Sequence, residues 1–483
     1  MTKRLMDARL KLAFSAVSVL LMLLLTAGGV VAGGYALSGV GSKAIGMGGA
    51  FRGLADDWSA AYWNPAGLTQ LEESEFNSML VMLNPRPEYT PNIYHEGVAV
   101  GYRNDEVLYP DDHTIFIPDA SGFFKFDKFE KYTVGVGIFV PIGFQSKWDL
   151  YDPLDQMDIR HSFPTWEHEG KLSVIDIHPT IARSFMDSKF SLGVGVSLLK
   201  GDIELIKPAI IPSPFPLPHE NILIQSELVG DGWGFGVNFG TLYKFNEKFQ
   251  FGISGKLPAT VDIEGTARQE MYVMDNDILK DILLEQASSP AEEAMIRGLF
   301  GPSNLSSEPN AKAELKIPGD VGFGFAVKPS NNMTFVGEVD YTYWSQVEQI
   351  VIDMEGVNPL GMPADSSTLM FNWENTLRIS LGAEYFPTEP LALRFGYYFD
   401  PSPVPDETFT PLIPDMGNKN SYNLGAALYL GSFELAYNYE YIGFEDRVVT
   451  ESVDVNGDGS YDNYAGDFKM TLHASHVSFT YRF

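Results

Sequence analysis

The sequence predicts an all-β, monomeric transmembrane barrel of about fourteen antiparallel strands, with a small N-terminal segment that plugs its lumen. Three observations support this fold class. The chain starts with a leader for export, apolar residues recur at every second position, and short connections alternate with long ones. A barrel in an outer membrane needs all three, because each spanning strand has one face in lipid and the other in a polar lumen.

The N-terminus has the layout of a secretory signal peptide over residues 1–32. A basic start precedes an apolar stretch over residues 12–31 that ends in small residues, so we expect cleavage after Ala32. The alternative is a signal anchor, since the stretch is long enough to span a bilayer. We expect the plug in residues 33–72 and the barrel in residues 73–483. The basic residues of the leader are Lys3, Arg4, Arg9 and Lys11.

Composition narrows the range of partners. The chain has 63 acidic and 33 basic residues, for a formal net charge of −30, which disfavours nucleic acid as a partner. In an exported protein we expect this acidity in loops and rims, where it would hold divalent cations beside lipopolysaccharide. There is no cysteine, so sheet closure and packing must hold the fold without disulfides.

From about residue 130 onward, apolar side chains alternate with small or charged ones. In the run 132–142, the even positions such as Val140 and Ile142 are apolar, while Gly135 and Gly137 share the other face. A soluble sandwich would bury its apolar faces and would rarely repeat glycine opposite them, whereas a membrane barrel turns the apolar face to lipid. Comparable runs are 190–198, 233–239, 249–257, 321–327, 377–385, 391–399 and 477–483.

The connections between these runs are asymmetric. Short polar turns are followed by segments of roughly 20 to 45 residues, as in barrels with short periplasmic turns and long external loops. An even number of strands returns both termini to the periplasm. The short turns are expected at 187–189, 246–248, 330–332, 388–390 and 431–432.

Residues 33–70 fit no strand. Glycines punctuate small residues up to Gly49, and the segment continues to the run Asn64-Pro65-Ala66-Gly67. We expect compact, partly helical structure that folds into the lumen as a plug. A loose periplasmic tail is the alternative, because alternation alone cannot place this segment.

Several motifs together resemble the FadL family of outer-membrane long-chain fatty-acid transporters, which includes toluene-type hydrocarbon transporters. The resemblance covers the whole mature chain. Its motifs are Gly-Met-Gly-Gly-Ala-Phe at 46–51, Ala-Asp-Asp at 55–57, Asn-Pro-Ala-Gly at 64–67, Asp-Gly-Trp-Gly-Phe-Gly at 231–236, Ile-Pro at 317–318, the proline-rich run 400–408 with 411–415 after it, and the terminal Phe483.

The resemblance implies a plug, or hatch, that carries the signature Asn64, Pro65 and Ala66. It also implies a hydrophobic groove between the third and fourth external loops, a tighter inner pocket, and a lateral opening where the third strand is kinked inward. The matching strand here is 131–142, with Gly135 and Gly137 as gate residues. These glycines could instead simply pack the lumen.

The expected third loop, 203–228, is more apolar than an exposed loop should be, which favours a ligand-binding surface. Residues 274–300, in the expected fourth loop, have helical spacing and predict a small amphipathic helix. The alternative is packing between loops. The candidate groove residues are Ile206, Ile210, Ile211, Phe215 and Leu217 in one loop, and Ile278, Leu279, Ile282, Leu283, Ile296 and Leu299 in the other.

A carboxylate head group would need cations or hydrogen-bond donors in the lumen. Lys256, Arg378 and Arg394 are the candidates, although Glu338 and Glu384 share their face and favour structural ion pairs instead.

Asp454, Asn456 and Asp458 mimic the start of a calcium loop, but Ala465 stands where a bidentate Glu belongs, so an ordinary turn is favoured. No cofactor motif, nucleophile elbow or phosphate loop is found, which disfavours an enzyme.

We therefore expect a protein of the outer membrane of a Gram-negative bacterium that takes up a hydrophobic molecule passively, by default a long-chain fatty acid. A monoaromatic or alkane hydrocarbon is the nearest alternative ligand. A surface receptor that uses the barrel only as an anchor is the alternative from another class.

Overall fold

The computed structural model describes residues 34–95, 98–99, 102–111, 114–126, 129–151, 163–212, 221–272, 277–413, 415–458 and 460–483. The expected leader 1–32 and the groove candidates Phe215 and Leu217 lie outside these ranges. Among the described residues, no helix is both long enough and apolar enough to cross a bilayer.

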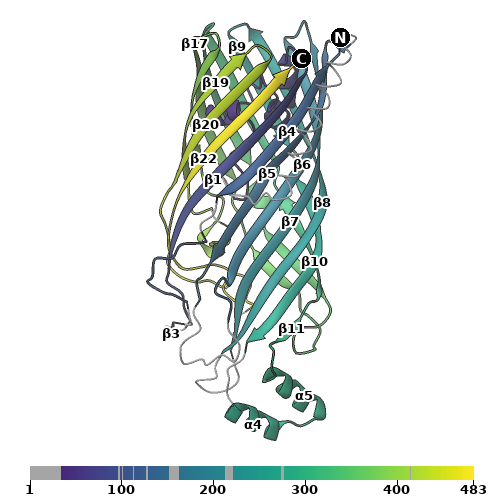
Figure 1. The fold of residues 1–483 in the computed structure, drawn as a ribbon, viewed down its shortest axis with the longest axis vertical. Coiled ribbons are helices and arrows are strands. Elements are labelled where there is room, and N and C mark those ends of the chain that lie inside the picture. The colour runs from purple at the N-terminus through teal and green to yellow at the C-terminus, as the bar shows by residue number, and fades with distance from the viewer. Residues whose placement is uncertain are drawn as a thin grey trace.

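Fourteen spanning strands form a closed antiparallel barrel in the described part of the chain (Figure 1). Strand β1 (Glu75–Pro91) pairs with β22 (Gly466–Arg482) on one side and with β4 (Ile115–Lys125) on the other, which closes the sheet. Closure leaves no open edge, as the hydrocarbon of a membrane requires. The predicted all-β antiparallel barrel of about fourteen strands is confirmed.

The remaining spanning strands follow one another in chain order. Four of them are interrupted, so that each consists of two shorter strands. The uninterrupted ones are β5 (Tyr132–Trp148), β6 (His168–Phe185), β7 (Phe190–Pro212), β8 (Asn221–Asn246), β18 (Leu391–Asp400), β19 (Lys419–Leu430) and β20 (Phe433–Phe444); the interrupted ones are β9 (Phe249–Lys256) with β10 (Ala259–Tyr272), β12 (Asn310–Ile317) with β13 (Asp320–Ser330), β14 (Met333–Thr342) with β15 (Gln349–Glu355), and β16 (Ser367–Met370) with β17 (Thr376–Thr388).

The short strands and helices lie outside the spanning wall or within the lumen. They are β2 (Tyr94–His95), β3 (Val98–Ala99), β11 (Leu305–Ser307) and β21 (Arg447–Val449), the α-helices α2 (Ser42–Gly46), α3 (Ala60–Trp63), α4 (Asp277–Gln286) and α5 (Pro290–Leu299), and the 3-10 helices η1 (Pro65–Gln70), η3 (Trp344–Gln346) and η4 (Asp406–Thr408).

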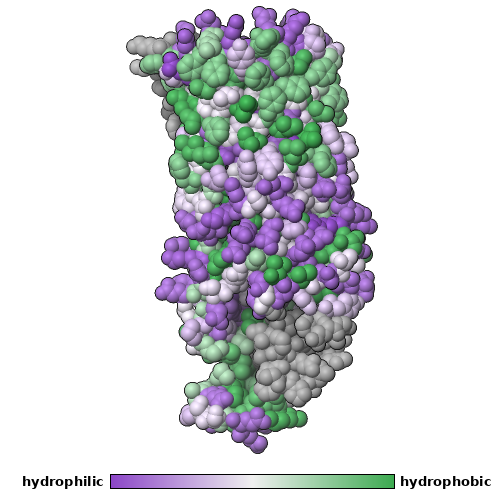
Figure 2. Space-filling model, turned by 180° about the vertical axis from the view of Figure 1, so that it is seen from behind, coloured by the Kyte–Doolittle hydropathy of each residue, from purple (hydrophilic) through white to green (hydrophobic). Residues whose placement is uncertain are grey.

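The wall has its apolar side chains outside and its charged ones inside. Trp233, Phe235 and Phe395 are exposed, whereas Glu338 and Glu384 are buried. Figure 2 shows the hydrophobic residues gathered at the end of the barrel that carries the short turns, with a hydrophilic zone beyond. The predicted turns lie at that end, which is therefore the periplasmic one.

The alternation in β5 changes phase, which corrects one expectation from the sequence. The register between β5 and β6 shifts between Phe139 and Ile142. Val140, Ile142 and Phe144 are buried instead of continuing the lipid face that starts at Val134 and Val136. A bulge that inserts a residue moves every later side chain to the opposite face, and strict alternation gave no sign of it.

The expected loop 203–228 is also corrected. Residues up to Pro212 continue β7 and residues from Asn221 begin β8, and the two segments pair in register. Prolines at 208 and 212 argued against a strand. The two segments pair nevertheless, because in a long hairpin the backbone N–H and C=O groups of each segment find hydrogen-bond partners on the other.

The region 274–300 forms two helices rather than one. Ser289 is the N-cap of α5, because its hydroxyl oxygen accepts a hydrogen bond from the backbone N–H of Glu292. Pro290 is the first residue of the helix. The pair of helices projects beyond the barrel at the end opposite the short turns (Figure 1).

Residues 34–71 form short helices and turns that contact the inner side of the wall. Helix α2 contacts β18, β19 and β20, and η1 contacts β6, β7 and β8. The wall glycines allow this close approach, because a Cβ at Gly193 would collide with the backbone of Pro65, and one at Gly396 with Gly48. The repeated inward glycines therefore make room for the N-terminal segment.

Buried ion pairs hold this segment to the wall. The Arg52 guanidinium contacts Glu338 at 3.1 Å, Asp320 at 2.7 Å and Asp340 at 2.8 Å. Its backbone N–H donates to Glu338 as well. Lys43 contacts Glu384 at 3.3 Å. Because breaking a buried pair leaves uncompensated charge, these contacts fix the middle of the segment in place.

We expect Arg52→Met to lower the free energy of unfolding by about 3–5 kcal/mol, because the buried Glu338 and the partly buried Asp320 and Asp340 lose their shared cation. Chemical denaturation of the refolded barrel in detergent micelles measures this. Arg268→Met is the matched control, since its pair with Glu270 is exposed, and it should change stability little. Equal stability of the two variants would contradict the structural role of Arg52.

Candidate functional site

The wall is interrupted between the second and third spanning strands. β4 and β5 pair from Lys125↔Thr133 to Ala120↔Ile138 and no further. β4 continues to pair with β1 up to Ile115, and β5 continues to pair with β6 up to Trp148. The two strands therefore separate beyond Ile138. At the far end, the N–H of Asp111 donates to the carbonyl of Lys147.

Two other parts of the protein form hydrogen bonds with β5 where its pairing with β4 has stopped. The buried Asp119 carboxylate accepts a bond of 3.1 Å from the backbone N–H of Val140. Further on, the N–H of Leu37 donates to the carbonyl of Pro141, and the N–H of Gly143 donates to the carbonyl of Tyr35. The start of the N-terminal segment thus forms a short antiparallel bridge with β5 at its kink.

Aromatic packing fixes this bridge. The Tyr35 ring lies 5.2 Å from that of Trp344 and 5.1 Å from that of Trp373, and its hydroxyl donates to the carbonyl of Lys316. Gly34 donates its backbone N–H to the buried carboxylate of Asp415. We call residues 34–41 the strap, because they cross the lumen between the kink of β5 and the opposite wall.

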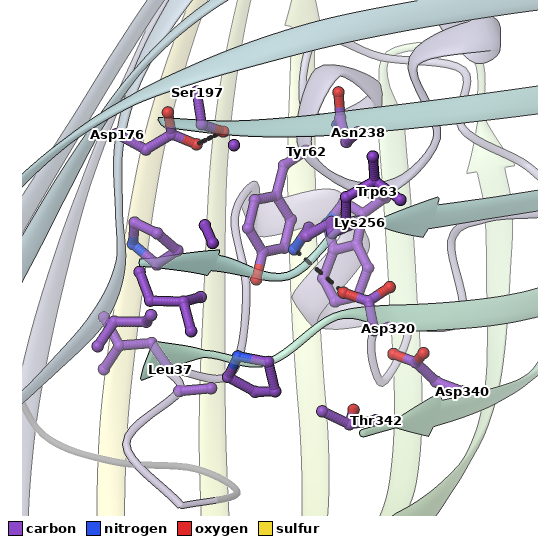
Figure 3. A pocket seen from close by; sticks show the side chains of 18 of the residues that line it. Leu37, Tyr62, Trp63, Asp176, Ser197, Asn238, Lys256, Asp320, Asp340 and Thr342 are labelled. Carbon is purple, nitrogen blue, oxygen red and sulfur yellow. Dashed lines mark hydrogen bonds and ion pairs between the residues drawn. The ribbon is translucent and has the colours of Figure 1, made fainter. Parts of the chain in front are cut away.

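An inner cavity of about 140 Å³ lies beside the strap (Figure 3). It has an aromatic and aliphatic side and a polar side, which suits a molecule with both characters. Its apolar lining includes Tyr35, Leu37, Tyr62, Trp63, Ile142, Leu199 and Trp344, and its charged lining consists of Arg52, Asp176, Lys256, Asp320, Asp340, Arg378 and Asp400.

Each of three cavity carboxylates already has a strong partner. Asp320 and Asp340 are both bound by Arg52, and Asp176 accepts a hydrogen bond of 2.9 Å from the hydroxyl of Ser197. The Lys256 ammonium, by contrast, lies 3.5 Å from the Tyr62 ring centroid and only 3.9 Å from Asp320. Among the described cations of this lining, Lys256 and Arg378 are the two that no carboxylate binds closely, so both can bind a further anion.

The other two head-group candidates differ from Lys256. Arg378 lines the cavity, and its guanidinium packs 3.8 Å from the Tyr398 ring centroid. Arg394 is 1% exposed and is bound by Glu384 at 2.8 Å. It does not line the cavity, so the structure does not support Arg394 as a head-group contact.

The cavity also contains Asp176, His178 and Ser197, a set of residue types that serves hydrolases. Here Nδ1 of the histidine faces both the Asp176 carboxylate and the Ser197 hydroxyl, at 3.0 Å each, while Nε2 faces Asn238. A nucleophilic serine needs the ring nitrogen opposite the one that the carboxylate binds. The arrangement is a structural hydrogen-bond cluster.

A second, smaller cavity of about 20 Å³ lies against the interrupted wall. Val81, Ile117, Asp119 and Val140 line it from the wall side. Leu37 and Ser38 line both this cavity and the inner one, so the strap forms part of the partition between them.

A third cavity, of about 230 Å³, lies toward the end with the long loops. Leu205, Leu228, Ile352 and Phe371 are among its apolar residues. Its charged residues are Lys207, Glu227, Asp458 and Asp462, and burial raises the pKa of Asp462 above its usual value. We call it the mouth cavity.

Several sequence candidates lie elsewhere. Ile206 lies between Leu205 and Lys207, whose side chains line the mouth cavity, so it points to the opposite face of β7. Ile282 and Leu283 are on α4 and line none of the three cavities. Ile210 and Ile211 pair in β7, but their side chains lie outside the described residues.

The Asn64-Pro65-Ala66 run is fully inside the barrel. The Asn64 amide donates to the carbonyls of Arg52 at 2.7 Å and Thr241 at 3.0 Å, and its oxygen accepts from Ala66. Pro65 starts η1. The run therefore joins the N-terminal segment to β8.

The predicted gate residues lie next to the interruption. Gly135 pairs with Phe123, and Gly137 pairs with Ser121, in the last paired stretch of β4 and β5. A Cβ at Gly137 would overlap the Phe139 ring, so the glycine gives this ring its place at the kink.

The Asp454 loop is held by hydrogen bonds within itself. Asp454 accepts hydrogen bonds from the N–H groups of Gly457 and Asp458, and Asn456 bonds Asp458. Among the described residues, no group of three His, Asp or Glu side chains is arranged to hold a metal.

With this geometry in view, the comparison with known proteins is decisive. A family model described as outer membrane protein transport protein (OMPP1/FadL/TodX) matches residues 23–483. The chain belongs to this family. It is therefore an outer-membrane protein, and the family transports hydrophobic ligands through monomeric barrels.

Relatives of this OMPP1/FadL/TodX member share about a quarter of its residues or fewer. It is 22% identical over 393 residues to a long-chain fatty acid transport protein of Escherichia coli O6:H1, covering 77% of this chain and 78% of that one. It is 24% identical over 417 residues to a 47 kDa outer membrane protein of Pasteurella multocida, covering 84% and 85%.

Solved structures confirm the fold of this family member. A Pseudomonas aeruginosa FadL homologue superposes with a TM-score of 0.72 at 17% identity, covering 93% of this chain and 100% of the other. The Pseudomonas putida toluene transporter TodX gives 0.70 at 15% identity, covering 92% and 99%. At these identities the likeness shows the fold alone, so it leaves the ligand open.

Sequence reasoning missed the residues that complete the site. Tyr35, Asp119 and His178 each belong to it. A lone Asp in the apolar strand 115–120 was a usable signal, because an unpaired carboxylate is costly among apolar side chains. Tyr35 gave no such signal, since its partners lie more than 100 residues away in the sequence.

Proposed function

We propose that the protein takes up long-chain fatty acids passively and releases them sideways into the outer membrane. The observation that carries this proposal is Lys256, a cation that faces an amphipathic cavity while the carboxylates around it are already bound. A carboxylate head group would form an ion pair with the Lys256 ammonium, and the apolar lining would contact the first part of the acyl chain. A hydrocarbon would leave the polar side of the cavity unused.

Capture begins outside the barrel in this proposal. Helices α4 and α5 expose apolar side chains, including Ile278 at 74% and Ile282 at 45%. The mouth cavity, which apolar residues such as Leu228 and Phe371 line together with polar ones, lies between the long loops and the lumen. Burial of each methylene contributes about 0.8 kcal/mol, so apolar contact alone supplies most of the affinity.

Movement of the strap then releases the ligand. Leu37 and Ser38 separate the inner cavity from the cavity at the interrupted wall, and two backbone hydrogen bonds hold them to β5. Residues 42–71 stay in place, because Arg52 and Lys43 are bound to the wall by buried ion pairs. In this proposal residues 33–72 act as the hatch, but only its first part moves.

Two other functions make different demands. A hydrocarbon transporter needs no cation at Lys256, so it would bind neutral and acidic ligands alike. A surface receptor would use the external loops alone and would not depend on the interruption between β4 and β5. Lipopolysaccharide is the expected neighbour of the acidic rim in any of these cases.

The first test replaces the proposed head-group cation. We expect Lys256→Met to weaken palmitate binding by roughly ten- to a hundredfold, since a hydrogen bond to a charged group contributes about 1.5–3 kcal/mol. Binding of methyl palmitate should not change. Isothermal titration of the purified barrel with both ligands measures this.

Lys312→Met is the matched control, because Lys312 is exposed and pairs with Glu264. It should bind both ligands like the parent. If the parent binds the ester as tightly as the acid, or prefers toluene, the ligand is a neutral hydrophobe and the fatty-acid assignment fails.

The second test closes the interrupted wall. The chain has no cysteine, so a double variant Asp119→Cys with Val140→Cys carries a single possible disulfide. We expect oxidation to stop palmitate transfer into liposomes while palmitate binding remains, and reduction to restore transfer. Transfer at the parent rate with the disulfide formed would rule out lateral release at this place.

A further inference from the structure

The lipid-facing side of β4, β5, β6 and β7 has an open depression of about 620 Å³. It lies between the interrupted wall and the periplasmic end, and its lining is almost entirely apolar. The lining residues are Gly122, Phe124, Val134, Gly135, Val136, Pro179, Thr180, Ile181, Val194 and Val196.

The depression follows from the register of the strands. Gly122 pairs with Val136, and Val136 pairs with Pro179, so three small or compact residues stand side by side across three strands. Bulky side chains such as Leu381 and Phe395 cover the wall elsewhere. A row without them leaves a hollow in the lipid-facing surface.

A cation stands at the periplasmic end of the same face. On β6, Pro179, Ile181 and Arg183 alternate with buried residues and are all exposed. The Arg183 guanidinium carbon lies 4.9 Å from the Tyr132 ring centroid and 4.7 Å from that of Phe185. Two aromatic rings thus hold the guanidinium in place, and its N–H groups remain able to donate in the plane of the group.

Arg183 has no carboxylate partner among the described residues, unlike Arg52, Arg394 and Arg482. It precedes Phe185, the last residue of β6, by two positions and is therefore at the level of the membrane interface. It lies four positions after Pro179, or about 13 Å along the strand at 3.3 Å per residue. An anion at the interface and an apolar chain below it would occupy both features at once.

We propose that this face binds one phospholipid of the periplasmic leaflet, with its phosphate on Arg183 and one acyl chain in the depression. Arginine presents a planar fork of donors that matches phosphate, and the bilayer around this barrel offers phosphate and acyl chain in one molecule. The site is separate from the inner cavity. It ends two residues from Ile138, the last residue of β5 that pairs with β4, so the lipid lies at the foot of the interruption.

Native mass spectrometry tests the site. The barrel is released from nanodiscs of phosphatidylethanolamine and phosphatidylglycerol, and the phospholipid that stays bound is counted. We expect Arg183→Leu and Val136→Trp each to reduce the retained phospholipid about tenfold, the first by removing the phosphate contact and the second by filling the depression.

Matched controls are Lys248→Leu, which removes an exposed cation in another periplasmic turn, and Val339→Trp, which adds the same ring to the lipid face of β14. Both should retain phospholipid like the parent, and heat-dependent gel mobility verifies that all four variants are folded. Equal retention in every variant would overturn the proposal. So would loss in Val136→Trp alone, or retention of a free fatty acid or lipid A in place of a phospholipid.

Discussion

A backbone amide in the hydrocarbon of a membrane has no water to bond, so each strand of the barrel must find its partners within the protein. β4 and β5 meet this demand only up to Ile138. Beyond that point the Asp119 carboxylate and the backbone of Tyr35 and Leu37 take over some of the missing bonds. An interruption of the wall is tolerated because the lumen contains a segment that partly replaces the ladder.

This dependence divides the N-terminal segment into two parts with different roles. Residues 42–71 are fixed by Arg52, by Lys43 and by the Asn64 amide. The strap is held by two backbone bonds to β5, by the hydrogen bonds of Gly34 to Asp415 and of the Tyr35 hydroxyl to Lys316, and by the rings around Tyr35. It contains Gly39 and Gly41, whose positive φ angles of 131° and 91° suit glycine. The strap itself contains no charged residue, so it has none of the ion pairs that bind residues 42–71 to the wall.

The sequence was sufficient for the barrel, because alternation and turn residues act locally. Gly431 predicts a short turn at its own position, and the alternation in 377–385 predicts a strand there. The kink was harder to predict, since a bulge leaves composition unchanged and reverses only the later faces, here from Val140 onward.

Ion pairing limited the prediction of the site more than geometry did. Arg394 and Lys256 are equivalent by strand alternation, yet one is buried against Glu384 and the other faces the cavity. Their partners lie on other strands or on the N-terminal segment, so only the closed barrel distinguishes them. The extent of the third loop was mispredicted for a related reason, since the pairing of β7 with β8 is a long-range property.

The most direct test of the whole account is a crystal structure of the barrel with palmitate bound. The account predicts a carboxylate within 4 Å of the Lys256 ammonium and an acyl chain against Leu37 and Tyr62 in the inner cavity. Palmitate bound only among the external loops, or bound in the cavity with its carboxylate directed away from Lys256, would contradict it.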